Sequence, residues 1–190
     1  MSLRENQKEK RYQQILAIAL DEFITKGYYG TSTREIAKIA GISSGLMFHY
    51  FDSKLALYEA LIEIGCNEMG NWTPEEDCDS FTILKAAIEQ IFMAIEHNPY
   101  FCKMFIFMDQ ANRSNEISEK VNQRLSEQNI VSQTIPLIKK AQEAGQVREG
   151  DVQALSMAFW CAVQGIAQGK ADAPENVMPQ ADWVLDIIRK

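Results

Sequence analysis

Residues 31–54 read TSTREIAKIAGISSGLMFHYFDSK, and this stretch decides how the N-terminal part of the chain folds. Ser32 and Glu35 have the spacing of a capping box, which predicts a helix over 33–40. A glycine follows, and glycine readily adopts the left-handed conformation that ends helices. A second, short helix is predicted over 44–50, with a serine in front of it as its cap. Two short helices joined in this way have the geometry of a helix-turn-helix, whose second helix enters the major groove of DNA.

A longer amphipathic helix is predicted before this stretch, over 9–26. Its apolar residues recur at steps of three and four, which places them on one face, and Gly27 is expected to end the helix. Ser53 has the position of a cap for a fourth helix over about 54–70. The apolar face of the first helix consists of Tyr12, Ile15, Leu16, Ala19 and Phe23.

The rest of the chain also has the composition and spacing of a helical protein. Hydrophobic residues make up 46% of the 190 residues, with only 5 Pro and 10 Gly, and no run alternates apolar and polar residues as a strand does. Pro136 is expected to kink or split the helix in which it lies. The predicted fold is therefore all-α, with about nine helices. Those after residue 70 span about 80–96, 99–110, 115–144, 151–169 and 177–189.

Two parts are expected along the chain, a small head over 1–55 and a larger body over 56–190. The helix that starts at about residue 54 connects them. Residues 72–79 (WTPEEDCD) combine a proline with an acidic run and are interpreted as the linker between head and body. An ordinary solvated loop within one domain fits this composition equally well.

The net charge of −7 is unusual for a protein that binds nucleic acid, but it is unevenly distributed. Residues 1–55 contain eight Lys or Arg and six Asp or Glu, a net charge of +2. Residues 56–190 contain eleven and twenty, a net charge of −9. The head can therefore approach phosphates, whereas the body is repelled by them.

Met47 and Phe51 are four residues apart, which predicts that both face the core of the head. The other side chains of 44–50 then point away from the core, and a DNA groove explains two exposed aromatics and a histidine on so short a helix. An apolar side chain there contacts a thymine methyl group, and a histidine or tyrosine donates to a phosphate. The alternative is that Phe48 and Tyr50 are part of the core.

This segment resembles the tetracycline-repressor (TetR-type) family of bacterial transcriptional regulators. The resemblance covers about residues 9–60 and is carried by 33–37 (TREIA), 40–45 (AGISSG) and 47–54 (MFHYFDSK). It implies a DNA-binding domain over 1–55 and a ligand-binding and dimerisation domain over the rest. The protein is then expected to be a repressor, released from a palindromic operator in double-stranded DNA by a small apolar or amphipathic effector. By position, the implied DNA contacts are Thr33, Arg34, Ser44, Gly45, Leu46, Phe48, His49, Tyr50 and Lys54.

The two C-terminal helices carry stripes of small or apolar residues that suit close helix packing. In relatives these helices pair with their copies as a four-helix bundle, so the resemblance implies a homodimer whose symmetry matches a palindromic site. The alternative is that both stripes close the core of a single chain. The expected interface residues are Ala154, Ala158, Ala162, Gly165, Gly169, Ala181, Val184, Leu185 and Ile188.

An effector pocket is expected among the aromatic and methionine residues of the body, since methionine adapts to varied apolar ligands. For each of these residues an ordinary core position is the alternative, because aromatics at helical spacing are mostly core. The candidate pocket residues are Phe92, Met93, Phe101, Met104, Phe105, Met108, Phe159 and Trp160.

Other classes of protein find little support in the sequence. The four cysteines form no Cys-x-x-Cys pair and only two histidines are present, so neither a metal site nor a cofactor is expected. Gly41-Ile42-Ser43-Ser44-Gly45 fits a hydrolase motif, but that motif needs a preceding strand, and no enzyme is expected. No stretch of about 18 apolar residues could span a membrane, and a cytoplasmic protein is predicted. The alternative function is a helical module that binds protein through its acidic body.

Overall fold

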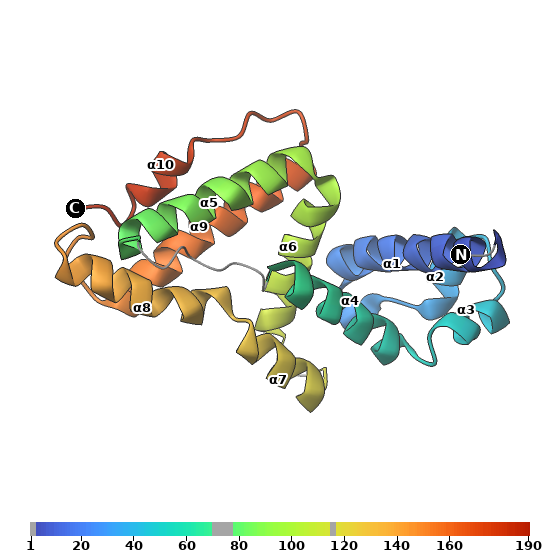
Figure 1. Cartoon of the computed structure of the whole chain (residues 1–190). Helices are drawn as coiled ribbons and strands as arrows, with labels where there is room; N and C mark the ends of the chain where they lie inside the picture. The colour runs from blue at the N-terminus through green and yellow to red at the C-terminus, as the bar shows by residue number, and fades with distance from the viewer. Residues whose placement is uncertain (1–2, 70–77, 115–116) are drawn as a thin grey trace. The chain divides into compact units, whose positions relative to one another are not determined.

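The computed structural model describes residues 3–69, 78–114 and 117–190. Within these ranges every regular element is a helix, and the one β-type pairing is an isolated bridge between Val147 and Arg189. The prediction of an all-α fold is confirmed. None of the described helices combines the length and the apolar content needed to cross a membrane. The helices form two compact units, drawn in Figure 1.

The first unit is formed by Met1–Glu68 and Phe107–Leu125. Its apolar core contains Leu16, Ile36, Met47 and Leu61, each almost completely buried. This core brings the helices of the predicted head together with the segment that follows Phe107. The helices are α1 (Leu3–Gly30), α2 (Thr33–Ile39), α3 (Ser44–Tyr50), α4 (Lys54–Met69), the end of α6 (Pro99–Arg113) and most of α7 (Glu119–Glu127).

Two glycines with positive φ shape the first unit. Gly27 has φ 68° and ψ 175° and interrupts α1, which begins at Leu3 and so includes the predicted helix. Gly41 has φ 66° and closes α2, so that the chain can turn directly into α3. Residues other than glycine rarely adopt such backbone angles, which explains why α1 is interrupted and α2 ends at glycines.

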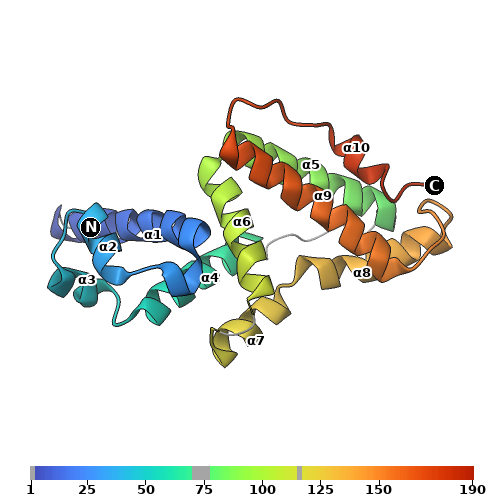
Figure 2. The ribbon, with the colours of Figure 1, turned by 180° about the vertical axis from the view of Figure 1, so that it is seen from behind.

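The second unit is formed by Met69–Ile106 and Ser126–Lys190. In it α5 (Ser80–His97), α8 (Ile130–Glu143) and α9 (Val152–Asp172) pack against one another in pairs. The short α10 (Ala181–Leu185) contacts α5 and α9. Figures 1 and 2 show α5 and α9 side by side. Trp160 of α9 is buried in the core of this unit.

Helix ends in the second unit differ from the predictions in two places. The segment 115–144 does split, but at Asn129, which accepts a hydrogen bond from the Ser132 backbone N–H (3.1 Å) and starts α8. Pro136 lies inside α8. The predicted helix 177–189 is reduced to α10. After α10, the Arg148 guanidinium donates to the carbonyl oxygens of Asp186 and Arg189 (2.6 and 3.1 Å) and holds the chain end in a turn.

The predicted caps also have mixed outcomes. Ser43 and Ser53 cap α3 and α4 by accepting from Leu46 N–H (3.1 Å) and Ala56 N–H (3.0 Å). The capping box at the start of α2 is wrong, because the Ser32 side chain makes no cap hydrogen bond. The Glu35 carboxylate instead pairs with the Lys26 ammonium (3.0 Å), a partner from α1 that the local pattern could not reveal.

The compact units do not follow the predicted boundary at residue 55. The first unit continues through α4 and includes α7, since Tyr58 of α4 lies against the ring of Phe107 (5.0 Å between ring centroids). The predicted linker over 72–79 lies outside the described residues except for Cys78 and Asp79. Asp79 caps α5, and its hydrogen bonds, led by that from Thr82, lower the pKa of its carboxyl to about 2.

Candidate nucleic-acid interface

Helix α3 is held to the first unit by a few apolar residues. Met47 is almost completely buried, and Phe51, which follows the helix, stacks on Tyr12 of α1 with 5.1 Å between ring centroids. Both residues face the core as the spacing predicts. Because one side of a seven-residue helix is fixed in this way, its remaining side chains are presented together on the other side.

The presented side of α3 is both polar and apolar. Ser44, Gly45 and His49 are exposed, and Tyr50 is half-buried with its ring 6.0 Å from that of His49. Two large apolar side chains are also exposed, Leu46 by 41% and Phe48 by 49%. Phe48 is therefore not part of the core, and the alternative considered from the sequence is wrong for this residue.

Helix α2 lies beside α3 and adds two of the predicted contacts. Arg34 is exposed and Thr33 is half-buried, both at the start of the helix. The end of α2 is fixed by Arg11, whose guanidinium donates to the Ala40 carbonyl oxygen (3.2 Å). Sequence reasoning missed this role for Arg11, since a basic residue on an amphipathic helix gives no signal of a partner 29 residues away.

Lys54 is held by the protein itself. Its ammonium donates to the carbonyl oxygens of Tyr28 (2.8 Å) and Thr31 (3.1 Å) and lies 4.4 Å from the centroid of the Tyr28 ring. Lys54 thus joins the start of α4 to the turn between α1 and α2. A phosphate contact by the same ammonium remains a prediction.

Replacing Lys54 by Met is expected to lower the free energy of unfolding by about 1–2 kcal/mol, since two part-buried carbonyl oxygens lose a charged donor. Urea denaturation followed by circular dichroism measures this. Lys38→Met is the matched control, because Lys38 is exposed on α2, and a change within about 0.5 kcal/mol is expected. Equal stability of the two variants would contradict the role given to Lys54.

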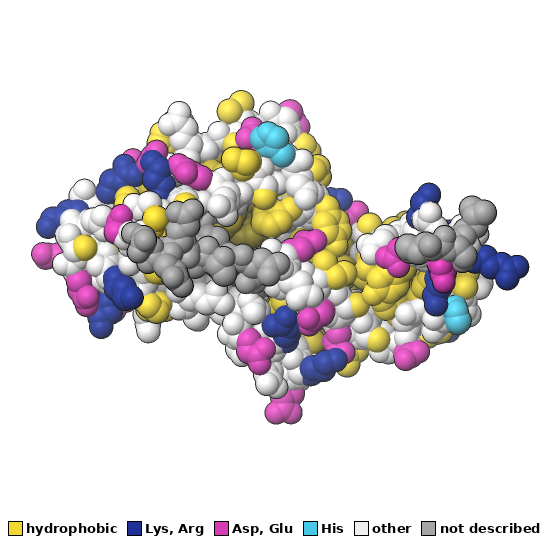
Figure 3. All heavy atoms as spheres, viewed as in Figure 1, with side chains coloured by type: hydrophobic (Ala, Val, Ile, Leu, Met, Phe, Trp, Pro, Cys, Tyr) yellow, Lys and Arg dark blue, Asp and Glu magenta, His cyan; other side chains and the backbone are white. Residues whose placement is uncertain are grey.

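The surface around α3 is mixed in charge. Figure 3 shows both basic and acidic side chains over α1 to α3 on the face that it draws. Net positive charge alone therefore does not define this interface, and the geometry of α2 and α3 carries more of the argument. Within 3–69, 78–114 and 117–190 no group of three or more His, Cys, Asp or Glu is arranged to hold a metal ion.

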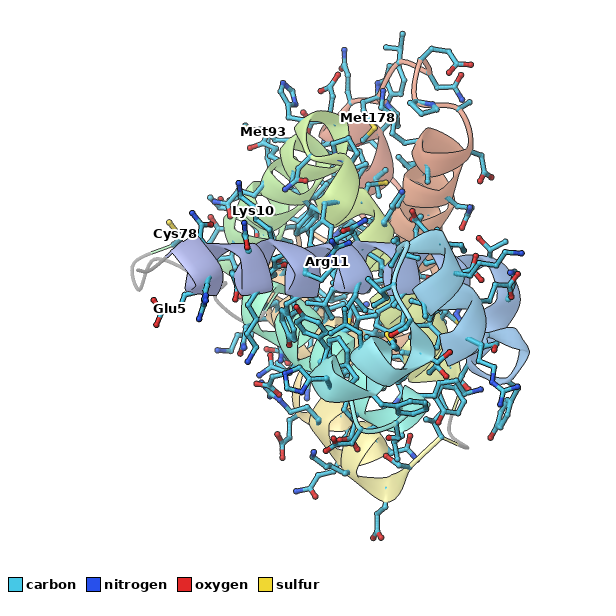
Figure 4. All side chains as sticks on the ribbon, turned by 90° about the vertical axis from the view of Figure 1, so that its right-hand side faces the viewer. Glu5, Lys10, Arg11, Cys78, Met93 and Met178 are labelled. Carbon is cyan, nitrogen blue, oxygen red and sulfur yellow. The ribbon has the colours of Figure 1, made fainter. Side chains whose placement is uncertain are left out.

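The candidate pocket residues lie mostly in the core. Met104 and Phe159 are completely buried, and the indole N–H of Trp160 donates to the Thr134 hydroxyl (2.8 Å). Met93 is an exception and a correction: it is 64% exposed and projects outward from α5 in Figure 4, so it lines no interior cavity. A cavity of about 150 Å³ in the second unit is lined by other residues, among them Ile95, Cys102 and Lys170.

The predicted dimer residues of α9 differ in exposure from those near the C-terminus. On α9, Ala154, Ala158 and Gly165 are exposed, whereas Ala162 and Gly169 are half-exposed. The prediction is wrong for Val184 and Leu185 of α10 and for Ile188, which follows that helix, because all three are buried in the core of their own chain, and Ala181 is half-buried. Here the alternative of a closed core holds.

The exposed face of α9 contains more than the predicted stripe. Cys161 lies on the same side of the helix as Ala158 and Gly165, at steps of three and four residues, and is exposed with a free thiol. Large apolar side chains are exposed nearby in the sequence of α9 and on α10, namely Met157 (62%) and Trp183 (61%). The stripe of small residues on α9 gives no indication of these three side chains.

A family model described as bacterial regulatory proteins, tetR family, matches residues 15–61. Two curated relatives come from Mycolicibacterium smegmatis (strain ATCC 700084 / mc(2)155). The transcriptional activator FasR is 31% identical over 48% of this chain and 43% of its own length. The transcriptional repressor KstR2 is 28% identical over 60% of this chain and 56% of its own length. The chain thus spans about half the length of these relatives.

Among solved structures, the chain is similar to AibR in complex with isovaleryl coenzyme A and operator DNA. The two share 18% identity, the alignment covers 93% of this chain and 94% of AibR, and the TM-score is 0.68. At this identity the similarity is one of fold, and it extends over nearly the whole chain.

Proposed function

Since the chain belongs to the tetR family of bacterial regulatory proteins, we propose that it regulates transcription by binding double-stranded DNA through α2 and α3. The observation that carries this proposal is the side of α3 that faces away from Met47. A seven-residue helix fixed by one buried residue and two caps leaves a continuous face that fits the major groove.

The proposed contacts follow from where the side chains lie. Arg34 reaches a base edge or a phosphate from the start of α2, and Thr33 donates to a phosphate. Gly45 and His49 lie at the centre of the presented side of α3, so the backbone approaches the base edges most closely there. Ser44, Tyr50 and Lys54 contact the flanking phosphates, in addition to the internal hydrogen bonds of Lys54.

We further propose that two copies of the chain pair through the exposed face of α9, with Trp183 of α10 at its edge. Small residues on that face allow close approach, since a Cβ added at Gly165 or Gly169 would meet no atom within 4 Å in the single chain. A two-fold dimer presents two copies of α3 and therefore binds a palindromic operator.

Binding of a small apolar or amphipathic effector in the second unit is proposed as the switch. AibR, which shares the fold, binds isovaleryl coenzyme A, an amphipathic molecule. The dimer is expected to have one arrangement in which its two copies of α3 match successive major grooves and another in which they do not. An effector that binds the second arrangement more tightly shifts the equilibrium towards it, and the repressor then leaves the operator. The proposed activity is binding without catalysis, and it takes place in the cytoplasm, where bacterial DNA lies.

Selection of bound duplexes from a random pool tests the DNA-binding function. A two-fold symmetric consensus is expected, with an affinity that falls steeply as salt rises because phosphate contacts release counterions. A module that binds only protein would enrich no sequence, and that result would refute the proposal.

On the selected duplex, Arg34→Ala is expected to weaken binding by about 1–3 kcal/mol per base contact that it removes. The matched control is Lys139→Ala, which removes one exposed positive charge from α8 of the second unit and is expected to leave affinity unchanged. Fluorescence anisotropy at two salt concentrations measures both. If Arg34→Ala binds like the parent, Arg34 is not part of the interface.

A further inference from the structure

The two exposed apolar side chains of α3 lie on either side of its presented face. Leu46 and Phe48 are two residues apart, so they project in nearly opposite directions around the helix. Gly45 and His49 lie between them on the side facing away from Met47, and Met47 itself is buried. A binding partner that covers this face therefore contacts a centre without large apolar side chains and one apolar side chain on each side of it.

Double-stranded DNA is the occupant that the surroundings favour. Residues 1–55 carry a net charge of +2 whereas residues 56–190 carry −9, so the segment that contains α3 repels a polyanion less than the rest of the chain does. Gly45 adds no side chain, and a Cβ there would meet only the Ser43 hydroxyl oxygen at 3.9 Å, so the helix backbone can approach a groove floor closely.

A leucine or phenylalanine side chain cannot read most base edges. In the major groove guanine, adenine and cytosine present hydrogen-bonding groups, and burying those against an apolar side chain leaves them unsatisfied. Thymine alone presents a methyl group there, which an apolar side chain contacts favourably. Covering Leu46 and Phe48 is therefore most favourable where thymine lies opposite them.

Resting on the proposed function, we propose that Leu46 and Phe48 are specificity-determining residues that recognise thymine methyl groups, so that each half-site of the operator carries thymine opposite them. Polar contacts from Arg34 and His49 then select the neighbouring positions. The apolar pair accounts for two exposed hydrophobic side chains that contribute little to the core of the head.

The test replaces thymine by deoxyuridine, one position at a time, in the duplex selected from the random pool. This change removes only the 5-methyl group and keeps base pairing. Removing one contacted methyl group is expected to raise the Kd of the duplex about fourfold relative to the thymine duplex. Removing the symmetric pair, one in each half-site, is expected to raise it about sixteenfold. Other thymines in the same duplex serve as internal controls and are expected to show no change.

Leu46→Ala and Phe48→Ala assign each methyl to its side chain. Each variant is expected to abolish the difference between thymine and deoxyuridine at one position per half-site and to preserve it at the other. Both changes are on the surface, and thermal unfolding followed by circular dichroism checks that the head remains folded.

The possible failures are distinguishable. If no duplex is enriched from the pool, the proposed DNA-binding function fails. If a duplex is enriched but deoxyuridine binds as well as thymine at every position, the function stands and the recognition of methyl groups is refuted. If both alanine variants still bind the thymine duplex more tightly than the deoxyuridine duplex at every contacted position, the assignment to Leu46 and Phe48 is also refuted.

Discussion

Placing a glutamate at residue 158 is expected to separate the proposed dimer into monomers and to weaken DNA binding by about 100-fold or more. Ala158 is exposed on α9, at the middle of the face opposite the buried Phe159 and Val163. A residue near a two-fold axis meets its own copy, so Ala158→Glu brings two carboxylates together in a desolvated contact.

The size of the effect follows from the loss of linkage between the two heads. When two heads are joined, binding of the second becomes intramolecular, which raises affinity by about 10² to 10⁴ over a single head. Sedimentation velocity measures the oligomeric state, and fluorescence anisotropy on the selected duplex measures the affinity. A monomeric variant that binds DNA as tightly as the parent would show that dimerisation does not contribute.

Gln153→Glu is the matched control for this change. Gln153 is also exposed on α9, but it lies towards the side of the helix rather than on the face of Ala158. It adds the same charge in the first turn of the helix, where an acidic residue is favourable, so the fold is expected to be retained. We expect this variant to remain dimeric.

The free thiol of Cys161 offers a second measurement on the same face. In a Cys78→Ser background, which removes the other exposed cysteine, a bifunctional maleimide is expected to cross-link Cys161 to its copy. Cross-linking should disappear in Ala158→Glu and persist in Gln153→Glu. If neither the background protein nor the two variants cross-link, the contact between copies lies elsewhere on the chain, and if all of them cross-link equally, Ala158 is not part of the contact.

Local signals in the sequence were sufficient for the parts of the head that depend on a few neighbouring residues. The bounds of α2 and α3 agree with the prediction to within one residue, and Ser43 and Ser53 cap as expected. Apart from the start of α2, where Ser32 makes no cap hydrogen bond, each of these features depends on a glycine or serine within four residues of the position that it fixes. The sequence therefore carries the information in the segment itself.

Features that depend on a distant partner could not be predicted in this way. Glu35 had the spacing of a capping box, but Lys26 of α1 takes its carboxylate. Lys54 is expected from the resemblance to contact DNA, and nothing in the local sequence indicates the two carbonyl oxygens to which its ammonium donates. In both cases the competing group comes from another helix, and only the tertiary structure reveals it.

The periodicity of small and apolar residues identifies one face of a helix, but it does not show which part of the protein covers that face. The stripes on α9 and α10 have the same spacing, yet Ala158 is exposed whereas Val184 and Leu185 are buried against their own chain. The residues of α10 are large and apolar, and α5 and α9 cover them. The residues of α9 are small, and their face is left open in the single chain.

Replacing Phe23 by Ala is expected to have the largest effect on stability, lowering the free energy of unfolding by about 3–5 kcal/mol. Phe23 is 1% exposed and its ring contacts three other aromatic rings of the first unit. The centroid distances are 5.0 Å to Tyr58, 6.1 Å to Tyr28 and 6.2 Å to Phe107. Truncation leaves a cavity where α1, α4 and the end of α6 meet.

Phe48→Ala makes the same chemical change on the surface of the same unit and is therefore the control, with an expected change within about 0.5 kcal/mol. Urea denaturation at 25 °C measures the stability of both variants, and anisotropy of Phe23→Ala on the selected duplex shows whether its DNA binding is lost together with the fold. Folded domains are stable by only about 5–15 kcal/mol, so Phe23→Ala should leave a large fraction of the heads unable to bind at moderate urea concentrations. If the two variants unfold at the same urea concentration, the aromatic cluster does not join α1 to α4, and the position of α3 must be fixed by Met47 and the stacking of Phe51 on Tyr12 alone.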